Sequence, residues 1–223
     1  MIELLAGAAV RGSLPPSLIF AGPEGVGKQT AALALAAVLN CQAPVEWGSG
    51  RDACGVCAAC TRIARGVHAD ILTIQPGDTG SIKVDQIREA IERSAYRPFE
   101  GRRRVVIVDG ADAMVAEAQN ALLKTLEEPP AASTFVLVTP RPDVLLPTVR
   151  SRCQHLRFGR LSPADIAGIL IKAHGYSEAD AYAAASASDG SVGVAIDGGT
   201  EEFVEARDAA KRLLQGVAAS TDR

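Results

Sequence analysis

The sequence lacks any apolar stretch near the roughly 20 residues that a bilayer-spanning helix needs. Aromatic residues are scarce at 4%, which argues against a stacking surface for single-stranded nucleic acid. Positive charge is not in excess, because 23 Lys and Arg stand against 26 Asp and Glu, for a net charge of −3. Proteins that bind DNA mainly by neutralising phosphates are usually basic, so we expect any DNA contact to be local or shared with partners. The basic run at residues 102–104 is most simply a solvated turn, with phosphate contact as the alternative.

The first ten residues also lack the features of a secretory signal. They are largely apolar but contain Glu3 and have no basic leader. We therefore expect a cytoplasmic protein with no membrane partner. The five cysteines of such a chain indicate reduced thiols or a metal site, not disulfides.

Short apolar segments alternate with helical patterns through the first 158 residues. We predict strands at 18–21, 71–75, 105–109, 135–139 and 154–158, and helices at 29–39, 84–95 and 116–127. The runs VVIVD and FVLVT are apolar almost throughout, which is typical of parallel strands buried on both faces. The pattern predicts an α/β domain over residues 1–158, with a parallel sheet and helices on both faces.

After residue 158 the pattern changes to helices alone. Ser162, Pro163 and Asp165 supply a cap, a proline at the first helical position and an acid in the first turn. Further candidate caps and stops are Ser177, Thr200, Gly175 and Gly190. We expect a small all-helical domain over residues 159–223, which packs closely on the first because no long linker separates them.

A phosphate-binding loop, GPEGVGK, lies between the first predicted strand and helix. Its key residues are Gly22, Gly25, Gly27 and Lys28. In a P-loop the backbone N–H groups cradle phosphates and the lysine neutralises them. The magnesium-ligating Ser or Thr that usually follows is replaced by Gln29, with Thr30 one place later, and glutamine suits an octahedral magnesium site poorly. The loop predicts the fold, and it leaves open whether nucleotide binds or the turn is merely retained.

The third predicted strand ends in Asp109, where P-loop ATPases carry the aspartate that bridges to magnesium. In hydrolysing members a glutamate that polarises the attacking water commonly follows, but here the next residue is Gly110. Asp112 begins the next helix and is expected to point elsewhere. Without both the loop hydroxyl and the water-activating acid, the chain is predicted not to hydrolyse ATP by itself.

Four cysteines form a C-x12-C-x2-C-x2-C pattern, namely Cys41, Cys54, Cys57 and Cys60. Four thiolates with two such short spacings match a closed tetrahedral zinc site. A site with four protein ligands has no open position for substrate, so the predicted zinc is structural. The segment GSG at 48–50 predicts a flexible loop before the last three cysteines. The alternatives are four incidental thiols, or His68 as a ligand.

Two further motifs carry a family resemblance. NALLKTLEEPP at residues 120–130 and SRC at 151–153 resemble the AAA+ subunits of the bacterial DNA polymerase III clamp loader, which are the tau/gamma ATPase and delta-prime. The similarity covers nearly the whole chain and implies a RecA-like P-loop AAA+ domain, a small helical lid and a C-terminal collar. The sequence has no room for the collar and begins close to the first strand, so we expect a fragment, monomeric on its own. The family also carries a cysteine zinc module at residues 41–60.

The resemblance assigns roles to particular positions. Family ATPases have a hydroxyl residue after the loop lysine, a glutamate after the strand aspartate and a γ-phosphate-sensing arginine in a lid motif. Gln29, Gly110 and Val194 stand at these positions, which resembles delta-prime. The loop lysine and the strand aspartate remain, and Thr139 matches the polar sensor that ends the fourth strand. ATP and magnesium are therefore expected to bind weakly or not at all.

The SRC motif contains Arg152, which in the family reaches across a subunit interface to the γ-phosphate of ATP bound next door. A planar, permanently charged guanidinium there stabilises charge on a transferring phosphoryl group. The alternative for an isolated arginine is an ordinary surface ion pair.

The resemblance thus implies a delta-prime-like subunit that supplies Arg152 in trans and a scaffold for ATP-dependent loading of the sliding clamp on primed DNA. Its implied partners are the tau/gamma and delta subunits, and through the complex the clamp and the DNA. The first alternative is an active tau/gamma-type ATPase that tolerates Gln29 and gives Thr30 or Asp112 an unusual role. The second is a nucleic-acid-binding module built on the cysteine element, which the acidic balance and scarce aromatics disfavour.

Overall fold

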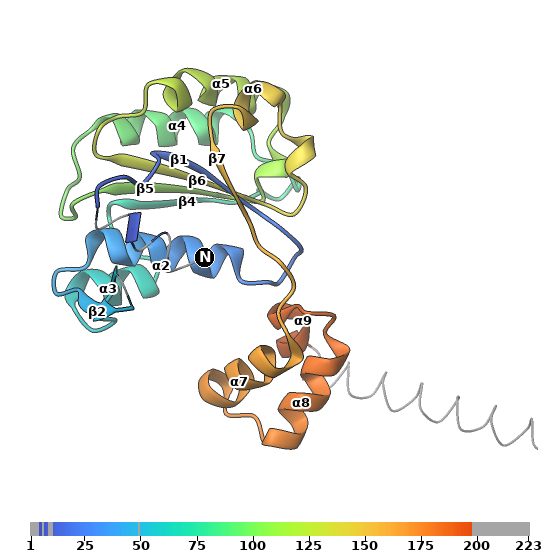
Figure 1. Ribbon diagram of the computed structural model, residues 1–223. Coiled ribbons are helices and arrows are strands. Elements are labelled where there is room, and N and C mark those ends of the chain that lie inside the picture. The colour runs from blue at the N-terminus through green and yellow to red at the C-terminus, as the bar shows by residue number, and fades with distance from the viewer. Residues whose placement is uncertain (1–4, 6, 9–10, 49, 198–223) are drawn as a thin grey trace, which may run out of the picture. The chain divides into compact units, whose positions relative to one another are not determined.

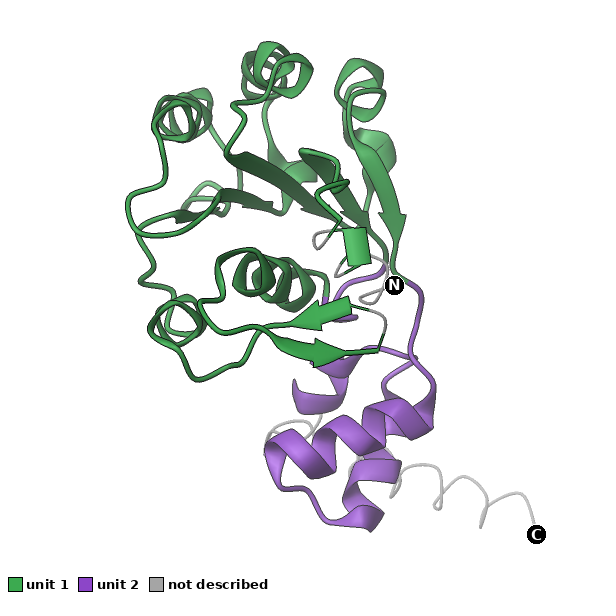
Figure 2. Cartoon of the chain, turned by 60° about the vertical axis from the view of Figure 1, so that its left-hand side comes forward, with its two compact units in different colours: residues 1–22, 28–158 green, residues 23–27, 159–223 purple. Residues whose placement is uncertain are grey.

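The computed structural model describes residues 5, 7–8, 11–48 and 50–197, and its contacts divide the chain into two compact units (Figures 1 and 2). The first unit comprises residues 1–22 and 28–158, and the second comprises residues 23–27 and 159–223. Thr200, a predicted helix cap, lies outside the described residues. Within the described part, no helix is long and apolar enough to cross a membrane.

The first unit is built on a five-stranded parallel sheet with the order β4-β5-β6-β1-β7. The strands are β1 Ser17–Ala21, β4 Ile71–Ile74, β5 Arg104–Asp109, β6 Ser133–Thr139 and β7 Gln154–Arg157. All five predicted strands are therefore confirmed, with ends that differ by at most two residues.

Helices cover both faces of this sheet (Figure 1). On one face lie α2 Lys28–Asn40 and, beside it, α3 Ala58–Ala64; on the other lie α4 Val84–Ala95, α5 Ala116–Glu127 and the short α6 Pro147–Arg150. Two 3-10 turns, η1 Ala111–Ala113 and η2 Pro142–Val144, join strands to helices. The predicted α/β architecture is confirmed.

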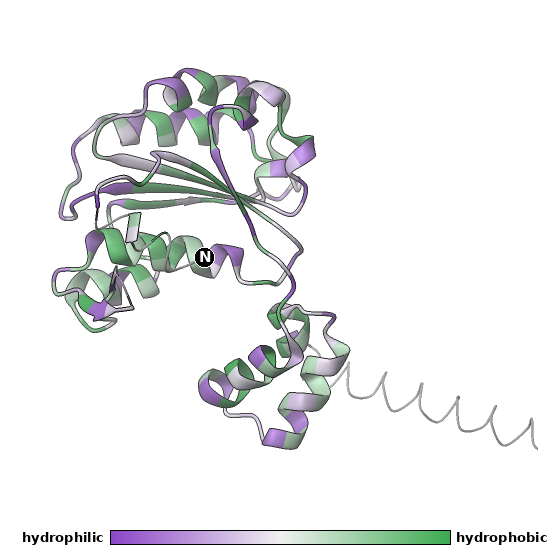
Figure 3. Cartoon of the chain, viewed as in Figure 1, coloured by the Kyte–Doolittle hydropathy of each residue, from purple (hydrophilic) through white to green (hydrophobic). Residues whose placement is uncertain are grey.

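The three central strands, β5, β6 and β1, are largely apolar because both of their faces are buried (Figure 3). Successive side chains of a strand point to opposite faces. In β1, Leu18 and Phe20 pack in the core on the α2 side, whereas Ile19 and Ala21 pack in the core shared with α4 and α5. The sheet thus separates two hydrophobic cores, and its position fixes where the strand ends present their polar residues.

The chain between α2 and α3 differs from the prediction of a flexible loop. It forms a short antiparallel hairpin of β2 Val45–Trp47 and β3 Gly50–Asp52. All three residues of β2 are exposed, so the segment has no buried face whose hydrophobic pattern the sequence could reveal.

The basic run is a solvated turn only in part: Arg102 is exposed and Arg103 half-buried in a bend, whereas Arg104 is buried. Arg104 is the first residue of β5, and its Nη2 lies 2.8 Å from Oδ1 of the buried Asp70. Arg103 Nη1 donates to Thr134 Oγ1 at 3.3 Å. The prediction was wrong for Arg104 because its buried carboxylate partner is 34 residues away in the sequence.

The second unit contains three described helices around a small apolar core. They are α7 Pro163–His174, α8 Glu178–Ala187 and α9 Val192–Asp197. The core consists of Ile166, Ala167, Leu170, Ala181, Ala185 and Ala195. The predicted all-helical character of this part is confirmed for the residues described.

The predicted caps of these helices are also confirmed. Ser162 Oγ accepts a hydrogen bond from the Asp165 N–H at 3.1 Å, and Ser177 Oγ accepts one from the Asp180 N–H at 3.2 Å. Gly175 ends α7 with a φ of 70°, a conformation that favours glycine. These local signals depend only on neighbouring residues, which is why the sequence reveals them.

Candidate functional site

The phosphate loop has the predicted setting between a strand and a helix, since it follows β1 and its last residue begins α2. A Cβ atom at Gly22 would overlap the carbonyl oxygen of Phe158, so the chain requires glycine there. Lys28 is only 6% exposed, and its Nζ donates to the carbonyl oxygen of Gly22 at 2.8 Å. The loop lysine thus has a backbone acceptor in the loop itself.

The turn of the loop belongs to the second unit and contacts the start of α9. The Gly193 N–H donates to the Gly25 carbonyl oxygen at 3.0 Å. Gly25 has a φ of 70°, and a Cβ there would overlap Ser191 Oγ. Val194, at the position where the family resemblance expects an arginine in ATPases, is 46% exposed and provides no charge.

Asp109 and Thr139 lie at the same sheet edge as the phosphate loop. The strands β5, β6 and β1 are neighbours, with Asp109 paired to Val138 and Thr139 paired to Ala21. The carboxyl ends of parallel strands lie at the same end of the sheet. Open α/β sheets bind their ligands just outside these carboxyl ends. The structure therefore brings Lys28, Asp109 and Thr139 to one edge, as a nucleotide-type site requires.

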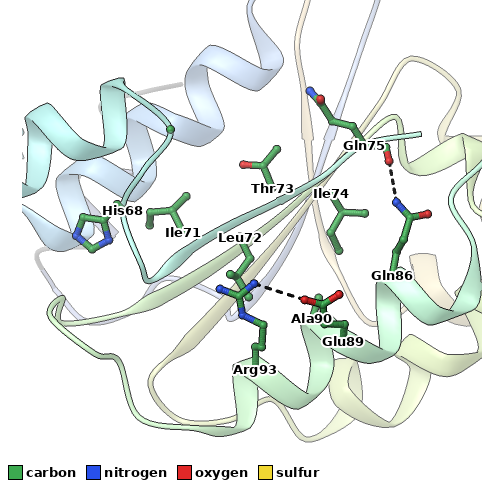
Figure 4. Close-up of a pocket in the computed structure, with 11 residues that line it drawn as sticks. His68, Ile71, Leu72, Thr73, Ile74, Gln75, Gln86, Glu89, Ala90 and Arg93 are labelled. Atoms are coloured by element: carbon green, nitrogen blue, oxygen red, sulfur yellow. Dashed lines mark hydrogen bonds and ion pairs between the residues drawn. The ribbon is translucent and has the colours of Figure 1, made fainter. Parts of the chain in front are cut away.

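Asp109 has a partner that the sequence analysis missed. Gln75 follows β4 and donates through Nε2 to Asp109 Oδ2 at 3.3 Å. Gln86 of α4 in turn donates to the Gln75 carbonyl oxygen at 3.1 Å (Figure 4). A polar residue directly after an edge strand, as Gln75 is, was the signal that could have predicted this contact.

Thr139 is held by Asp112, although Asp112 was expected to point away from the site. Thr139 Oγ1 donates to Asp112 Oδ1 at 3.0 Å and accepts from the Arg141 N–H at 3.0 Å. Arg141 also donates through Nε and Nη2 to Asp112 Oδ2, at 3.0 and 2.7 Å. The hydroxyl proton of the predicted sensor is therefore engaged within the chain.

Gly110 stands where the family resemblance expects a water-activating acid in ATPases. Its φ of 75° and ψ of 41° lie in the left-handed region, where a side chain costs roughly 1–2 kcal/mol. A Cβ atom there would also lie 3.2 Å from Cγ of Pro76. The backbone at this position disfavours any residue that could activate water.

The four predicted cysteines form a cluster. The Sγ atoms of Cys41, Cys54, Cys57 and Cys60 all lie within 4.8 Å of one another. Four sulfurs around a tetrahedral zinc, with Zn–S near 2.3 Å, would be about 3.8 Å apart, so the spacing fits such an ion. His68 is not part of this group; its Nδ1 accepts a hydrogen bond from the Asp70 N–H at 3.2 Å.

Backbone N–H groups surround the thiols of this cluster. Cys41 and Cys54 each accept an N–H hydrogen bond at 3.3 Å, from Cys54 and Cys57 respectively. The backbone N–H groups of Cys60 and Gln42 lower the pKa of Cys57 to about 6, whereas burial and the neighbouring Cys57 raise the pKa of Cys60 to about 12. Hydrogen bonds that stabilise thiolates prepare the cluster to hold a metal ion.

Arg152 lies between α6 and β7 and has several acceptors within the chain. Its Nε lies 2.8 Å from Glu127 Oε1, which Nη2 also contacts. Nη1 donates to the Thr148 carbonyl oxygen at 2.9 Å and to Ser151 Oγ at 3.3 Å. The ordinary ion pair considered as an alternative for this arginine is therefore present, although the side chain stays 32% exposed.

Arg152 lies at the end of the sheet where the strands begin, whereas the phosphate loop lies at the end where they finish. It precedes β7, whose first residue Gln154 pairs with Leu18 near the start of β1. From Leu18 to Gly22 the strand advances by about 13 Å, toward the edge with Asp109. The structure thus separates Arg152 from the other predicted nucleotide-site residues.

A polar pocket of about 460 Å³ runs along the edge strand β4 (Figure 4). Residues of β4 form one wall, and Gln86, Glu89 and Arg93 of α4 form another. His68, which was considered as an alternative zinc ligand, lines this pocket, but none of the four cysteines does. The pocket is therefore separate from the predicted metal ligands and from the phosphate loop.

Comparison with known proteins agrees with this architecture. A family model described as DNA polymerase III, delta subunit, matches residues 1–162. Subunit delta' of Bacillus subtilis is 38% identical over 172 residues, which is 77% of this chain and 50% of that protein. Subunit delta' of Pseudomonas aeruginosa is 41% identical over 133 residues, which is 59% of this chain and 39% of that protein. Subunit gamma/tau of Mycobacterium tuberculosis is 36% identical over 161 residues, which is 72% of this chain and 27% of that protein.

Solved structures share the fold. A gamma subunit-related protein of Thermotoga maritima has a TM-score of 0.55 at 23% identity, over 82% of this chain and 57% of that one. The RuvB Holliday junction branch migration motor of the same organism has a TM-score of 0.56 at 19% identity, over 88% of this chain and 57% of that one. The chain spans between about a quarter and a half of the curated relatives described above. On the family match and the identities to its relatives, the chain belongs to the DNA polymerase III delta subunit family.

Proposed function

We propose that this chain is a delta-prime-like part of a DNA polymerase III clamp loader. It acts on ATP through Arg152, in the site of a neighbouring subunit, and serves as a scaffold for loading the sliding clamp on primed DNA. It does not hydrolyse ATP itself, and any nucleotide at its own loop is weakly bound.

The observation that carries this proposal is the position of Arg152. The residue precedes β7 at the sheet edge opposite Lys28 and Asp109, so its guanidinium is directed away from its own phosphate loop. This placement keeps Arg152 away from a phosphate at the chain's own loop and supports a role at a site that another chain holds. An arginine supplied in this way raises phosphoryl-transfer rates by roughly three to five orders of magnitude.

The residues of the chain's own nucleotide site support the proposal that it does not hydrolyse ATP itself. Gln29 replaces the magnesium-ligating hydroxyl, Gly110 has a left-handed backbone, and Val194 provides no charge where the resemblance expects an arginine. Each change removes a different part of the machinery for hydrolysis. Their combination is expected in a subunit that no longer turns over ATP.

We also propose that the cysteine cluster holds one zinc ion with a structural role. All four ligands come from the chain, which leaves no position for a substrate. The cluster joins the end of α2 to the start of α3, so the ion would fix the hairpin segment between these helices. No part of the proposed ATP chemistry passes through it.

The test is ATP handling, first by the purified chain and then by a loader reconstituted with the full-length subunit. We expect no phosphate release by the chain, and loss of hydrolysis at the neighbouring site after Arg152→Ala. Normal hydrolysis by a loader that carries this substitution would overturn the proposed role of Arg152.

The relatives named gamma/tau favour one other candidate, a catalytically active loader ATPase. The same experiment separates the two functions. Phosphate release by the chain that Lys28→Ala abolishes would identify an active ATPase, and an Arg152→Ala loader would then retain the turnover of this subunit's own site.

A further inference from the structure

Glu127 and Arg152 are paired across two elements of the first unit. Glu127 is the last residue of α5, and Arg152 follows α6. Glu127 Oε1 accepts from Nε of the arginine at 2.8 Å and also contacts Nη2. The two side chains are 48% and 32% exposed, so the pair lies at the surface, where another subunit could reach it.

The position of Glu127 is locally unfavourable. Helix C-termini carry a partial negative charge, and a carboxylate there is destabilising, whereas a cation is favoured. The chain nevertheless has both Glu127 and Glu128 at the end of α5. The guanidinium of Arg152 offsets this repulsion at Glu127, which explains how the carboxylate is accommodated.

Most of the hydrogen-bonding capacity of Arg152 is already in use. A guanidinium has five N–H donors. The contacts with Glu127, the Thr148 carbonyl oxygen and Ser151 Oγ engage Nε, Nη1 and Nη2. A bidentate grip on a phosphate needs two parallel N–H groups, so Arg152 must give up at least one of these contacts to make it.

The pair also cancels the charge that a phosphate would attract. With Glu127 bound, the arginine presents almost no net charge to an approaching anion. An exposed ion pair is weak enough to be exchanged for a phosphate. On these grounds, and resting on the trans role proposed for Arg152, we propose that Glu127 is a positioning residue that holds this arginine and competes for it with the triphosphate of the nucleotide in the neighbouring subunit.

The test uses Glu127→Gln in a reconstituted loader in which only the neighbouring ATP site is active, the others having lost their loop lysines. Glutamine keeps the size and the acceptor oxygen but not the charge. It also removes an unfavourable charge from the end of α5, so folding is not expected to suffer. We expect the KM for ATP to fall roughly two- to five-fold, the range that an exposed ion pair allows, with kcat little changed.

The matched control is Glu128→Gln, which removes the adjacent charge from the same helix end. It should leave the KM unchanged, and Glu127→Gln should have no effect in a chain that already carries Arg152→Ala. An unchanged KM, a higher KM or a lower kcat for Glu127→Gln would overturn the competition. If Arg152→Ala alone has no effect on the neighbouring site, the trans role itself fails, so the two failures are distinguishable.

Discussion

Asp70 and Arg104 form a buried ion pair, with Asp70 Oδ1 2.8 Å from Arg104 Nη2 and side-chain exposures of 0% and 9%. The same carboxylate accepts the backbone N–H groups of Phe99, Glu100 and Gly101 at 2.7, 2.9 and 2.8 Å. Burial alone would raise the pKa of Asp70, but the hydrogen bonds from Arg104 and these N–H groups outweigh it and lower the pKa to about 2. Asp70 therefore ties the connection between α4 and β5 to the start of β4.

Asp70→Asn should destabilise the fold strongly. The substitution leaves Arg104 buried without a counter-charge, and breaking a buried pair in this way costs about 3–5 kcal/mol. Urea denaturation would measure the loss. The matched control is Asp78→Asn on an exposed loop, which should change the free energy of unfolding by less than about 0.5 kcal/mol. An equal effect of the two substitutions would contradict the role given to Asp70.

The same carboxylate predicts an acid dependence of stability. Its pKa is lowered from 3.8 to about 2 on folding, so its contribution is present above pH 4 and is lost as the pH falls through 2. The shift corresponds to about 2 kcal/mol. Urea titrations between pH 5 and pH 2 should therefore show the gap between the wild type and Asp70→Asn narrowing by this amount. A gap that is constant with pH would exclude the depressed pKa.

The cysteine cluster predicts one zinc ion per chain. Elemental analysis of protein purified in zinc-supplemented medium should give a ratio near one, and Cys60→Ser should lower it and reduce the melting temperature. Cys153 is buried elsewhere, where burial raises its pKa to about 12, so Cys153→Ala should retain the zinc. Equal zinc content in the two variants, or none in the wild type, would argue against the site.

Gly110 predicts that the water-activating acid cannot simply be restored. Gly110→Glu should leave ATP hydrolysis absent and lower the stability, because φ is 75° and the Pro76 ring is adjacent. Gly80 has a φ of 68° with no atom within 4 Å of an added Cβ, so Gly80→Ala measures the backbone cost alone, about 1–2 kcal/mol. Gly110→Ala should cost more than this in urea denaturation. Phosphate release by Gly110→Glu would show that one residue suffices to restore the site.

The sequence by itself determined the elements whose signals are local. The continuous apolar runs of β5 and β6 predicted buried parallel strands, because a strand covered by helices on both faces has no polar side. Ser162 and Ser177 predicted two helix starts, since a capping side chain bonds to an N–H three residues ahead. The spacing of the four cysteines predicted their cluster for a similar reason: Cys54, Cys57 and Cys60 follow one another at intervals of three residues.

Only the tertiary structure decided which distant polar residues meet. Glu127 contacts Arg152 across 25 residues, and Thr139 contacts Asp112 across 27. Such pairs depend on the order of the strands and on which helix ends lie side by side, and no local periodicity encodes them. The strand register likewise decided that Arg152 and Lys28 lie at opposite edges of the sheet. A motif can identify a charged side chain, but the packed sheet determines which groups compete for it.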